Sequence, residues 1–228
     1  TVFVSDFIKN LYFDQGLDDK IPHSVILTGV DENVFHPDGR AEIVIGGKIK
    51  VVSHHWSSNF MKGFDIYERF DLMLGETPYR DMFSFRMIGN IPRGLNLVNT
   101  EIYGPLSGHE LAARIRECHL YLTAARHEPG GNHYIEAMRC GLPVLYLESG
   151  SSGEYCSQWG GLGFTPLNFE EKLFDAVSDY EKNRVEVLKC PYSGAWMGQQ
   201  YESLFRGLCN RAEKTVVRLR LQGFHGVT

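Results

Sequence analysis

Short runs of apolar and β-branched residues alternate, along most of this chain, with segments whose apolar positions recur at helical spacing. The runs predict strands and the spaced segments predict helices. The predicted strands cover residues 2–5, 24–29, 48–53, 83–89, 100–104, 119–125 and 142–148. The predicted helices cover 6–16, 62–75, 107–118, a segment opening near Asn132, 168–185 and 194–213.

Strands that alternate with helices, and that are apolar along most of their length, are typical of a parallel sheet covered on both faces. We therefore expect an α/β fold with a doubly wound, Rossmann-like parallel sheet. The sequence contains no internal repeat and no low-complexity linker. After Leu208 comes a tail with Arg211, Lys214, Arg218 and Arg220, which we interpret as a solvated face or the start of a further segment.

Composition narrows the class of protein. The chain has 228 residues, of which 43% are hydrophobic, and a net charge of −5, so no overall positive field would attract nucleic acid. Five cysteines without a C-x-x-C spacing argue against a disulfide framework and a structural zinc site. No apolar run approaches the roughly 20 residues of a membrane span, and no signal peptide is visible. We expect a soluble, cytoplasmic protein that starts, at Thr1, inside a longer polypeptide.

The segment EPGGNHYIE, residues 128–136, carries the most informative chemistry. It follows a predicted strand and opens a helix, which is where parallel sheets bind ligands. Gly130 and Gly131 allow close approach of the backbone, Asn132 is expected to cap the helix, and the first-turn N–H groups favour an anion. Glu128 and Glu136 would repel that anion, so we expect them to accept hydrogen bonds from hydroxyls on either side. A sugar, a diphosphate and a ribose in one ligand would satisfy all three elements, which indicates a nucleotide-sugar.

The pattern resembles the E-x7-E signature of retaining glycosyltransferases with the GT-B fold, above all glycosyltransferase family 4. AMRCGLPVL and ESGSSGEY follow the two glutamates. The stretches TGVDENVFHP, MKGFDIYERF and SGHELAARIRECHLYLTAARHE resemble further family segments, in the family's order, from about Ser5 to Leu208. The resemblance implies the C-terminal, donor-binding domain of such an enzyme.

By that resemblance, Glu136 binds the ribose hydroxyls and Glu128 the hydroxyls of the transferred sugar. Lys62 contacts the donor diphosphate, and with Glu128 it is the expected catalytic pair. The backbone amides of residues 130–132 complete the phosphate site. Tyr103 and Gly104 lie where the family holds the base.

The chain departs from the family in the loop before the lysine, which lacks the usual arginine. Ser57 and Asn59 stand there and are expected to bind the donor, and His54 or His55 could replace the arginine if protonated beside a diphosphate. A metal role for these two histidines is disfavoured, because neighbours on a strand point to opposite faces.

Three other residues carry weaker expectations. His133 could touch the sugar, Glu154 is expected at the rim of the cleft, and Trp56 in the core or an interface.

The implied enzyme has two Rossmann-like domains. We expect residues 1–16 to be the end strand and crossover helix of an N-terminal acceptor domain, 17–192 the donor-binding domain, and 193–228 a C-terminal crossover helix with a basic tail. An N-terminal domain, a partner chain or a second copy would cover the remaining apolar surface. Peripheral membrane contact is a further alternative.

The expected activity is glycosyl transfer from a UDP- or GDP-linked sugar to an unknown acceptor. The sequence has no Asp-x-Asp motif, so we expect no metal and no other cofactor. Retention of anomeric configuration is implied by the resemblance alone. The alternatives are a non-catalytic nucleotide-sugar-binding or regulatory module, and a related epimerase or phosphorylase.

Overall fold

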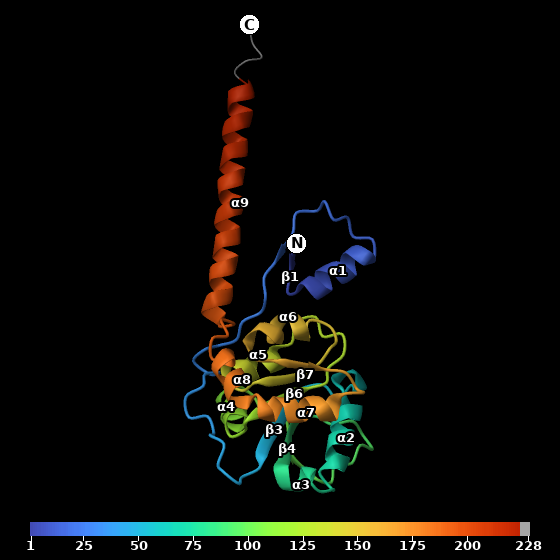
Figure 1. Ribbon diagram of the computed structural model, residues 1–228. Coiled ribbons are helices and arrows are strands. Elements are labelled where there is room, and N and C mark those ends of the chain that lie inside the picture. Colours follow the sequence, from blue (N-terminus) through green and yellow to red (C-terminus); the bar gives the residue numbers. More distant parts are fainter. Residues whose placement is uncertain (224–228) are drawn as a thin grey trace.

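A single parallel sheet forms the centre of the protein (Figure 1). The computed structural model describes residues 1–223, with side chains as far as Asn210. Six strands pair in the order β5-β4-β3-β6-β7-β8, and every pairing is parallel. The strands are β3 Ile49–His55, β4 Phe83–Gly89, β5 Thr100–Tyr103, β6 Leu120–Thr123, β7 Val144–Leu147 and β8 Leu162–Phe164.

Helices cover both faces of this sheet, because successive strand residues point to opposite sides. On one face, Val52 and Tyr121 belong to a core with α4, α5, α6 and α8. On the other face, Val51 and Leu122 belong to a core with α2 and α7. The helices are α2 Phe64–Met73, α3 Tyr79–Met82, α4 Gly108–Arg116, α5 Asn132–Arg139, α6 Ser152–Cys156, α7 Phe169–Ser178 and α8 Tyr180–Val187. The predicted doubly wound α/β fold is confirmed.

The order of the strands reverses between β3 and β6. From β3 the chain passes outward to β4 and β5, and it then returns to β6, which pairs with the opposite edge of β3. The loops that follow β3 and β6 therefore leave the sheet in opposite directions. A crevice at the carboxyl ends of such a pair of strands is where doubly wound folds bind ligands.

A small N-terminal unit stands over α6 (Figure 1). It consists of β1 Val2–Phe3, α1 Asp6–Asp14 and β2 Ser24–Val25, and β1 pairs with β2 in a separate parallel sheet. The carboxylate of Glu154, on α6, accepts the backbone N–H groups of Asp6 and Phe7 at 2.8 and 3.3 Å. The expectation that Glu154 lies at the rim of the cleft is wrong, because it caps the first turn of α1, whose N–H groups lack partners within the helix.

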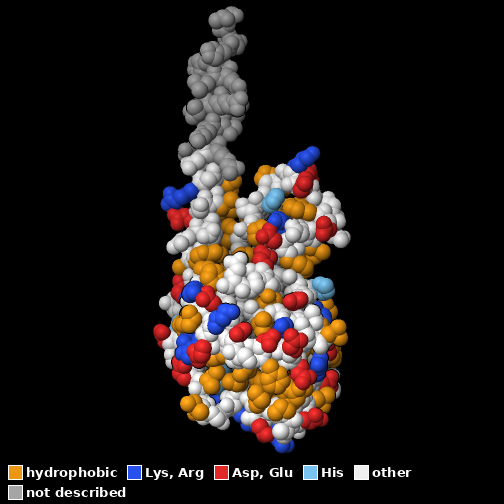
Figure 2. Space-filling view, viewed as in Figure 1, with side chains coloured by type: hydrophobic (Ala, Val, Ile, Leu, Met, Phe, Trp, Pro, Cys, Tyr) orange, Lys and Arg blue, Asp and Glu red, His pale blue; other side chains and the backbone are white. Residues whose placement is uncertain are grey.

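The last helix, α9 Gly194–Gly223, leaves the sheet domain and rises beside the N-terminal unit (Figure 1). Between the two lies a hollow lined by Val25, Ile26, Leu204, Phe205 and Leu208, and Figure 2 shows hydrophobic side chains along it. The side chains of the expected basic tail lie outside the described residues. Among the residues described, no helix has the length and apolar character that crossing a bilayer requires.

One predicted helix is wrong as a continuous element. Residues 168–185 form two helices, α7 and α8, which meet at Asp179. The apolar side of α7, with Phe169 and Leu173, packs on one face of the sheet, while Val187 of α8 belongs to the core on the other face. A straight helix cannot serve both faces, so the chain turns between them. The short elements β8, α3 and α6 were not predicted.

Candidate functional site

A cavity of ≈ 460 Å³ opens where β3 and β6 end. This volume is within the range of small-molecule sites. Side chains or backbone from both loops and from two helix starts, those of α4 and α5, contribute to its wall. The lining residues are Phe35, His54, His55, Trp56, Ser57, Lys62, Ser107, Gly108, Leu111, Glu128, Gly130, Gly131, Asn132, His133 and Glu136.

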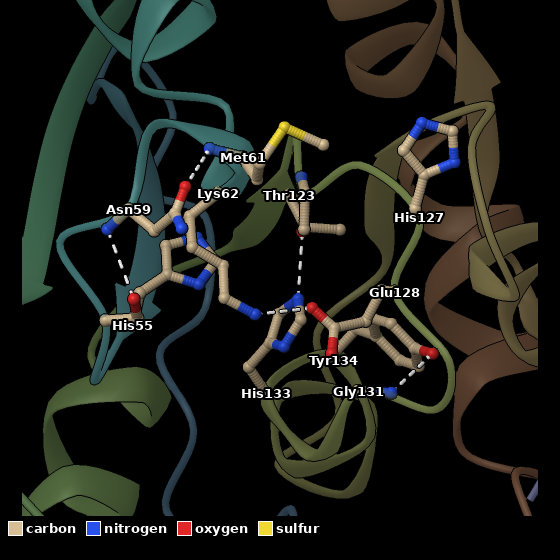
Figure 3. A network of polar contacts seen from close by, with 12 residues as sticks. His55, Asn59, Met61, Lys62, Thr123, His127, Glu128, Gly131, His133 and Tyr134 are labelled. Atoms are coloured by element: carbon tan, nitrogen blue, oxygen red, sulfur yellow. Dashed lines mark hydrogen bonds and ion pairs between the residues drawn. The ribbon is translucent and has the colours of Figure 1, made fainter.

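Lys62 and Glu128 face each other across the cavity (Figure 3). Lys62 ends the 3-10 helix η1 Phe60–Lys62, and its Nζ donates to Glu128 Oε2 at 2.5 Å. The two loops that carry them are joined by a backbone hydrogen bond, from Arg126 N–H to Met61 O at 2.8 Å. The 66 residues that separate Lys62 from Glu128 in sequence are thus bridged by the adjacency of β3 and β6.

The backbone around Glu128 is held by the loop that follows β7. His127, at φ 53°, is in the left-handed region that side chains disfavour, and its N–H donates to Ser149 Oγ at 3.0 Å. The carbonyl of Glu128 accepts from both the N–H and the hydroxyl of Ser151, at 2.9 Å each. A Cβ at Gly150 would lie 2.4 Å from the Glu128 nitrogen, so only glycine allows this contact. The His127 side chain points away from the network in Figure 3.

Glu136 has a different partner. It lies in the second turn of α5, and its Oε2 is 2.7 Å from Nε2 of His54. His54 is the penultimate residue of β3, is only 6% exposed, and packs edge-on against Tyr121. This contact fixes one carboxylate oxygen of Glu136 and leaves Oε1 for a ligand.

The start of α5 differs in one detail from expectation. Gly131 is the residue at the N-cap, and Asn132 is the first helical residue, so the predicted Asn132 cap is wrong. Instead, the hydroxyl of Tyr134 accepts the Gly131 N–H at 2.7 Å and contacts Ser151 Oγ at 2.9 Å (Figure 3). A side-chain oxygen from the third helical position therefore does the work of a cap. The following first-turn N–H groups have no partners within the helix and stand at the cavity wall.

His55 and His133 are buried at the cavity wall. Burial lowers the pKa of His55 well below its usual value, and the neighbouring His54 and Lys62 act in the same direction. Burial likewise lowers the pKa of His133, with His55, His54 and Lys62 contributing. Desolvation thus disfavours the imidazolium form of His55. That one of His54 and His55 replaces the arginine beside a bound diphosphate stays a prediction.

Three of the residues expected to bind the donor do not line the cavity. Asn59 caps η1, where its Oδ1 accepts the Met61 N–H at 2.9 Å. The Tyr103 hydroxyl donates to Glu101 at 2.7 Å, and its ring contacts the guanidinium groups of two arginines. Gly104 follows β5 outside the cavity wall. All the other expected site residues line the cavity.

Sequence reasoning missed several lining residues. Trp56 was expected in the core or an interface; it is not in the core, because it is 68% exposed beside the cavity. Ser107 and Gly108 bring the start of α4 to the same wall. The sequence signal for Ser107 was its position directly before a predicted helix. Its hydroxyl makes no capping bond in the described structure and therefore remains available to a ligand.

The parallel α/β sheet with helices on both faces is the fold of the C-terminal domain of GT-B glycosyltransferases. At its switch point, the start of α5 is flanked by two carboxylates and faced by a lysine. Residues 93–190 match the family described as Glycosyl transferases group 1. No curated protein sequence matches the chain significantly.

Solved structures share the fold at low sequence identity. Sucrose-phosphate synthase from Thermosynechococcus elongatus is 18% identical with a TM-score of 0.70, and the match covers 92% of this chain and 58% of that one. HepE from Anabaena, in complex with UDP and glucose, is 15% identical with a TM-score of 0.69, covering 90% and 62%. A chain of the GtfA/B complex is 15% identical with a TM-score of 0.66, and the match covers 90% of this chain and 44% of that one. The chain thus spans less than two thirds of these structures, and the likeness to them shows a shared fold.

Proposed function

We propose that this chain is the donor-binding half of a glycosyltransferase that takes a UDP- or GDP-linked sugar. One observation carries the proposal: Glu128 and Glu136 line the same cavity, on either side of the start of α5, and Lys62 faces them. An anion at the helix start is attracted by the first-turn N–H groups and by Lys62. Each carboxylate then reaches a hydroxylated end of the ligand, as ion–hydroxyl hydrogen bonds favour.

Lys62 is the only Lys or Arg that lines the cavity in the part of the chain described. It now donates to Glu128, so a bound diphosphate takes over its ammonium group and frees the Glu128 carboxylate for sugar hydroxyls. In glycosyl transfer, the bond from the anomeric carbon to the diphosphate oxygen breaks and negative charge grows on the diphosphate. Lys62 and the helix start are aimed where this charge develops, which is the arrangement that stabilises a transition state.

Three finer points belong to the same proposal. We propose that transfer needs no divalent metal, that anomeric configuration is retained as in glycosyltransferase family 4, and that the protein works in the cytoplasm. The described cysteines are all free, which suits a reducing compartment. Activity unaffected by EDTA, and an NMR assignment of the product anomer, test the first two points.

The acceptor would be bound by a second domain. HepE and sucrose-phosphate synthase are longer than this chain and share its fold over most of its length. The apolar hollow between α9 and the N-terminal unit is a surface that such a domain, or a partner chain, would cover. Some proteins of this fold act in complexes, as the name of the GtfA/B complex states.

A thermal-shift screen with UDP, GDP, ADP and their sugar conjugates tests the proposal. Ligand at about a hundred times its Kd stabilises a protein by about 2.7 kcal/mol, so binding gives a clear shift. Calorimetry then compares Glu136→Ala with Glu76→Ala, an exposed glutamate remote from the cavity. We expect only the first substitution to weaken nucleotide binding. If no nucleoside diphosphate binds at millimolar concentration, the proposal fails; if UDP binds but the full-length protein transfers no sugar, the chain is a binding module.

A further inference from the structure

Two imidazoles lie side by side at the wall of the cavity. The ring centroids of His55 and His133 are 4.9 Å apart, and the residues are 4% and 8% exposed. Neither forms a salt bridge with a carboxylate among the described residues: Glu136 is engaged by His54, and Glu128 by Lys62. The cavity thus contains two buried titratable rings beside the expected phosphate position.

The proton on His133 can be assigned from its partner. Nε2 of His133 lies 3.0 Å from the Thr123 hydroxyl (Figure 3). That hydroxyl also accepts the Ala125 N–H at 3.4 Å, and its own proton can be donated to the imidazole. In that arrangement Nε2 is the acceptor and Nδ1 carries the hydrogen. The Nδ1 edge faces Gly131, since a Cβ built there would lie 2.8 Å from Nδ1.

His55 repeats the arrangement with a phenol in place of the hydroxyl. Its Nε2 is 2.6 Å from the Tyr67 hydroxyl oxygen, which accepts the Ala124 N–H at 3.1 Å, and a longer contact of 3.4 Å joins the same Nε2 to Ser53 Oγ. Burial raises the pKa of Tyr67 to about 12, so the phenol keeps its proton. The imidazole nitrogen, at 2.6 Å, is the nearest acceptor for that proton. Nδ1 of His55 then also carries a hydrogen. It makes no hydrogen bond within the described residues.

The charges around the pair favour uncharged rings. His54 and Lys62 face both imidazoles and repel a proton, and burial acts in the same direction. The carboxylates of Glu128 and Glu136, which line the same cavity, are held by other partners. An uncharged N–H can still donate to an anion, as backbone amides do, and it needs no buried positive charge.

We propose that His55 and His133 are a pair of uncharged donors that bind the diphosphate through their Nδ1–H groups, with Thr123 and Tyr67 as the residues that set their tautomers. The inference rests on the proposed function and deepens it. It accounts for a phosphate site whose only lining Lys or Arg, within the described chain, is Lys62. Thr123 and Tyr67 are positioning residues, since each acts through an imidazole.

Two-dimensional ¹⁵N NMR of histidine side chains reads the tautomers in the ligand-free protein. We expect Nδ1-protonated, uncharged rings for both histidines from about pH 6 to 8, and we expect UDP to shift both Nδ1 signals. Thr123→Val should release the His133 ring into mixed tautomers, while Thr123→Ser keeps the hydroxyl and should preserve the single form. An Nε2–H tautomer in either ring of the unaltered protein overturns the proposal.

Paired substitutions test recognition. An asparagine amide nitrogen lies near the place of Nδ1, whereas a glutamine reaches the place of Nε2. His133→Asn should therefore keep UDP affinity within a few-fold, and His133→Gln should lose about 10- to 100-fold, the effect of one hydrogen bond to a charged group. Equal affinity of the Gln variant and the unaltered protein, with the variant folded by circular dichroism, overturns the proposal.

Inorganic pyrophosphate separates this proposal from the function on which it rests. If UDP binds tightly but leaves both Nδ1 signals unmoved, the donor pair is wrong and the nucleotide-sugar function stands. If no nucleoside diphosphate binds and pyrophosphate moves both signals, the donor pair stands and the proposed function falls. If neither probe moves the signals, the donor pair is overturned.

Discussion

The two glutamates that flank the start of α5 are held in different ways. Glu136 sits on a rigid helix and contacts a buried imidazole, His54, at 2.7 Å. Glu128 sits on a loop and pairs at 2.5 Å with Lys62, whose side chain is 25% exposed. The first contact can persist when a ligand binds, because it occupies one oxygen only. Under the proposed function the second must open, because Lys62 is the cation that would bind the diphosphate.

The comparison extends to the two walls of the cavity. The wall beside Glu136 consists of buried histidines whose hydrogen bonds are set by neighbouring hydroxyls. The wall beside Glu128 is a loop braced by the segment after β7. The wall beside Glu136 is preorganised by burial. The wall beside Glu128 is held by the Lys62–Glu128 ion pair, which under the proposed function gives up Lys62 to the diphosphate. Removing a residue from each wall should therefore have different consequences.

The largest effect should come from Lys62→Ala in the full-length enzyme. The substitution removes the ammonium group aimed at the leaving diphosphate, and we expect kcat to fall about 10²- to 10³-fold, as for other single preorganised donors. Steady-state kinetics measures the change, with Lys182→Ala, an exposed lysine on α8, as the matched control. An unchanged kcat would remove Lys62 from the mechanism.

Glu136→Ala should weaken UDP binding about 10- to 100-fold. The variant loses a charge-assisted hydrogen bond of about 1.5–3 kcal/mol and leaves His54 without its partner. Calorimetry with UDP measures the loss, and Glu136→Gln should fall between the variant and the unaltered protein. Equal binding by all three proteins would show that Glu136 does not face the ligand.

Acid should destabilise the folded protein through the buried histidines. Their folded-state pKa is lowered, so below about pH 6.5 the unfolded chain binds protons that the folded chain does not. The free energy of unfolding should then fall by about 1.4 kcal/mol per pH unit for each such histidine. Urea denaturation between pH 7.5 and 5.5 measures the slope, to which His119 also contributes. His133→Asn should reduce the slope by about one proton, and an unchanged slope would contradict the assignment.

Glu128→Gln should have the smallest effect, and in the opposite direction. Removing the carboxylate frees Lys62 and takes a negative charge away from the phosphate site, so UDP affinity should rise. Because the ion pair is partly exposed, its strength is that of a weak pair, and the gain should be no more than about fivefold. Calorimetry with UDP and with a UDP-sugar separates the roles, since the sugar conjugate should not share the gain. A loss of UDP affinity would contradict an ion pair that exchanges partners.

Much of the fold could be predicted from local pattern. The strand at 83–89 was predicted at its full length, and the helix start near Asn132 was placed correctly. The predicted helix at 168–185 failed because its two halves serve opposite faces of the sheet, which no local periodicity records. The Asn132 cap failed for a related reason, since the Tyr134 hydroxyl takes that role once the helix has formed.

The sequence by itself determined the alternation of strands and helices and the spacing of Glu128 and Glu136, because periodicity and motif spacing are properties of neighbouring residues. Only the tertiary structure decided which side chains contact one another in the site. His54 and Glu136 are 82 residues apart, and they meet because β6 inserts beside β3 in the sheet. The lowered pKa of His55 likewise comes from burial and from the nearby His54 and Lys62, and its Nε2 contacts the Tyr67 hydroxyl on another element. Charge and tautomer depend on the surroundings in space, which long-range packing alone creates.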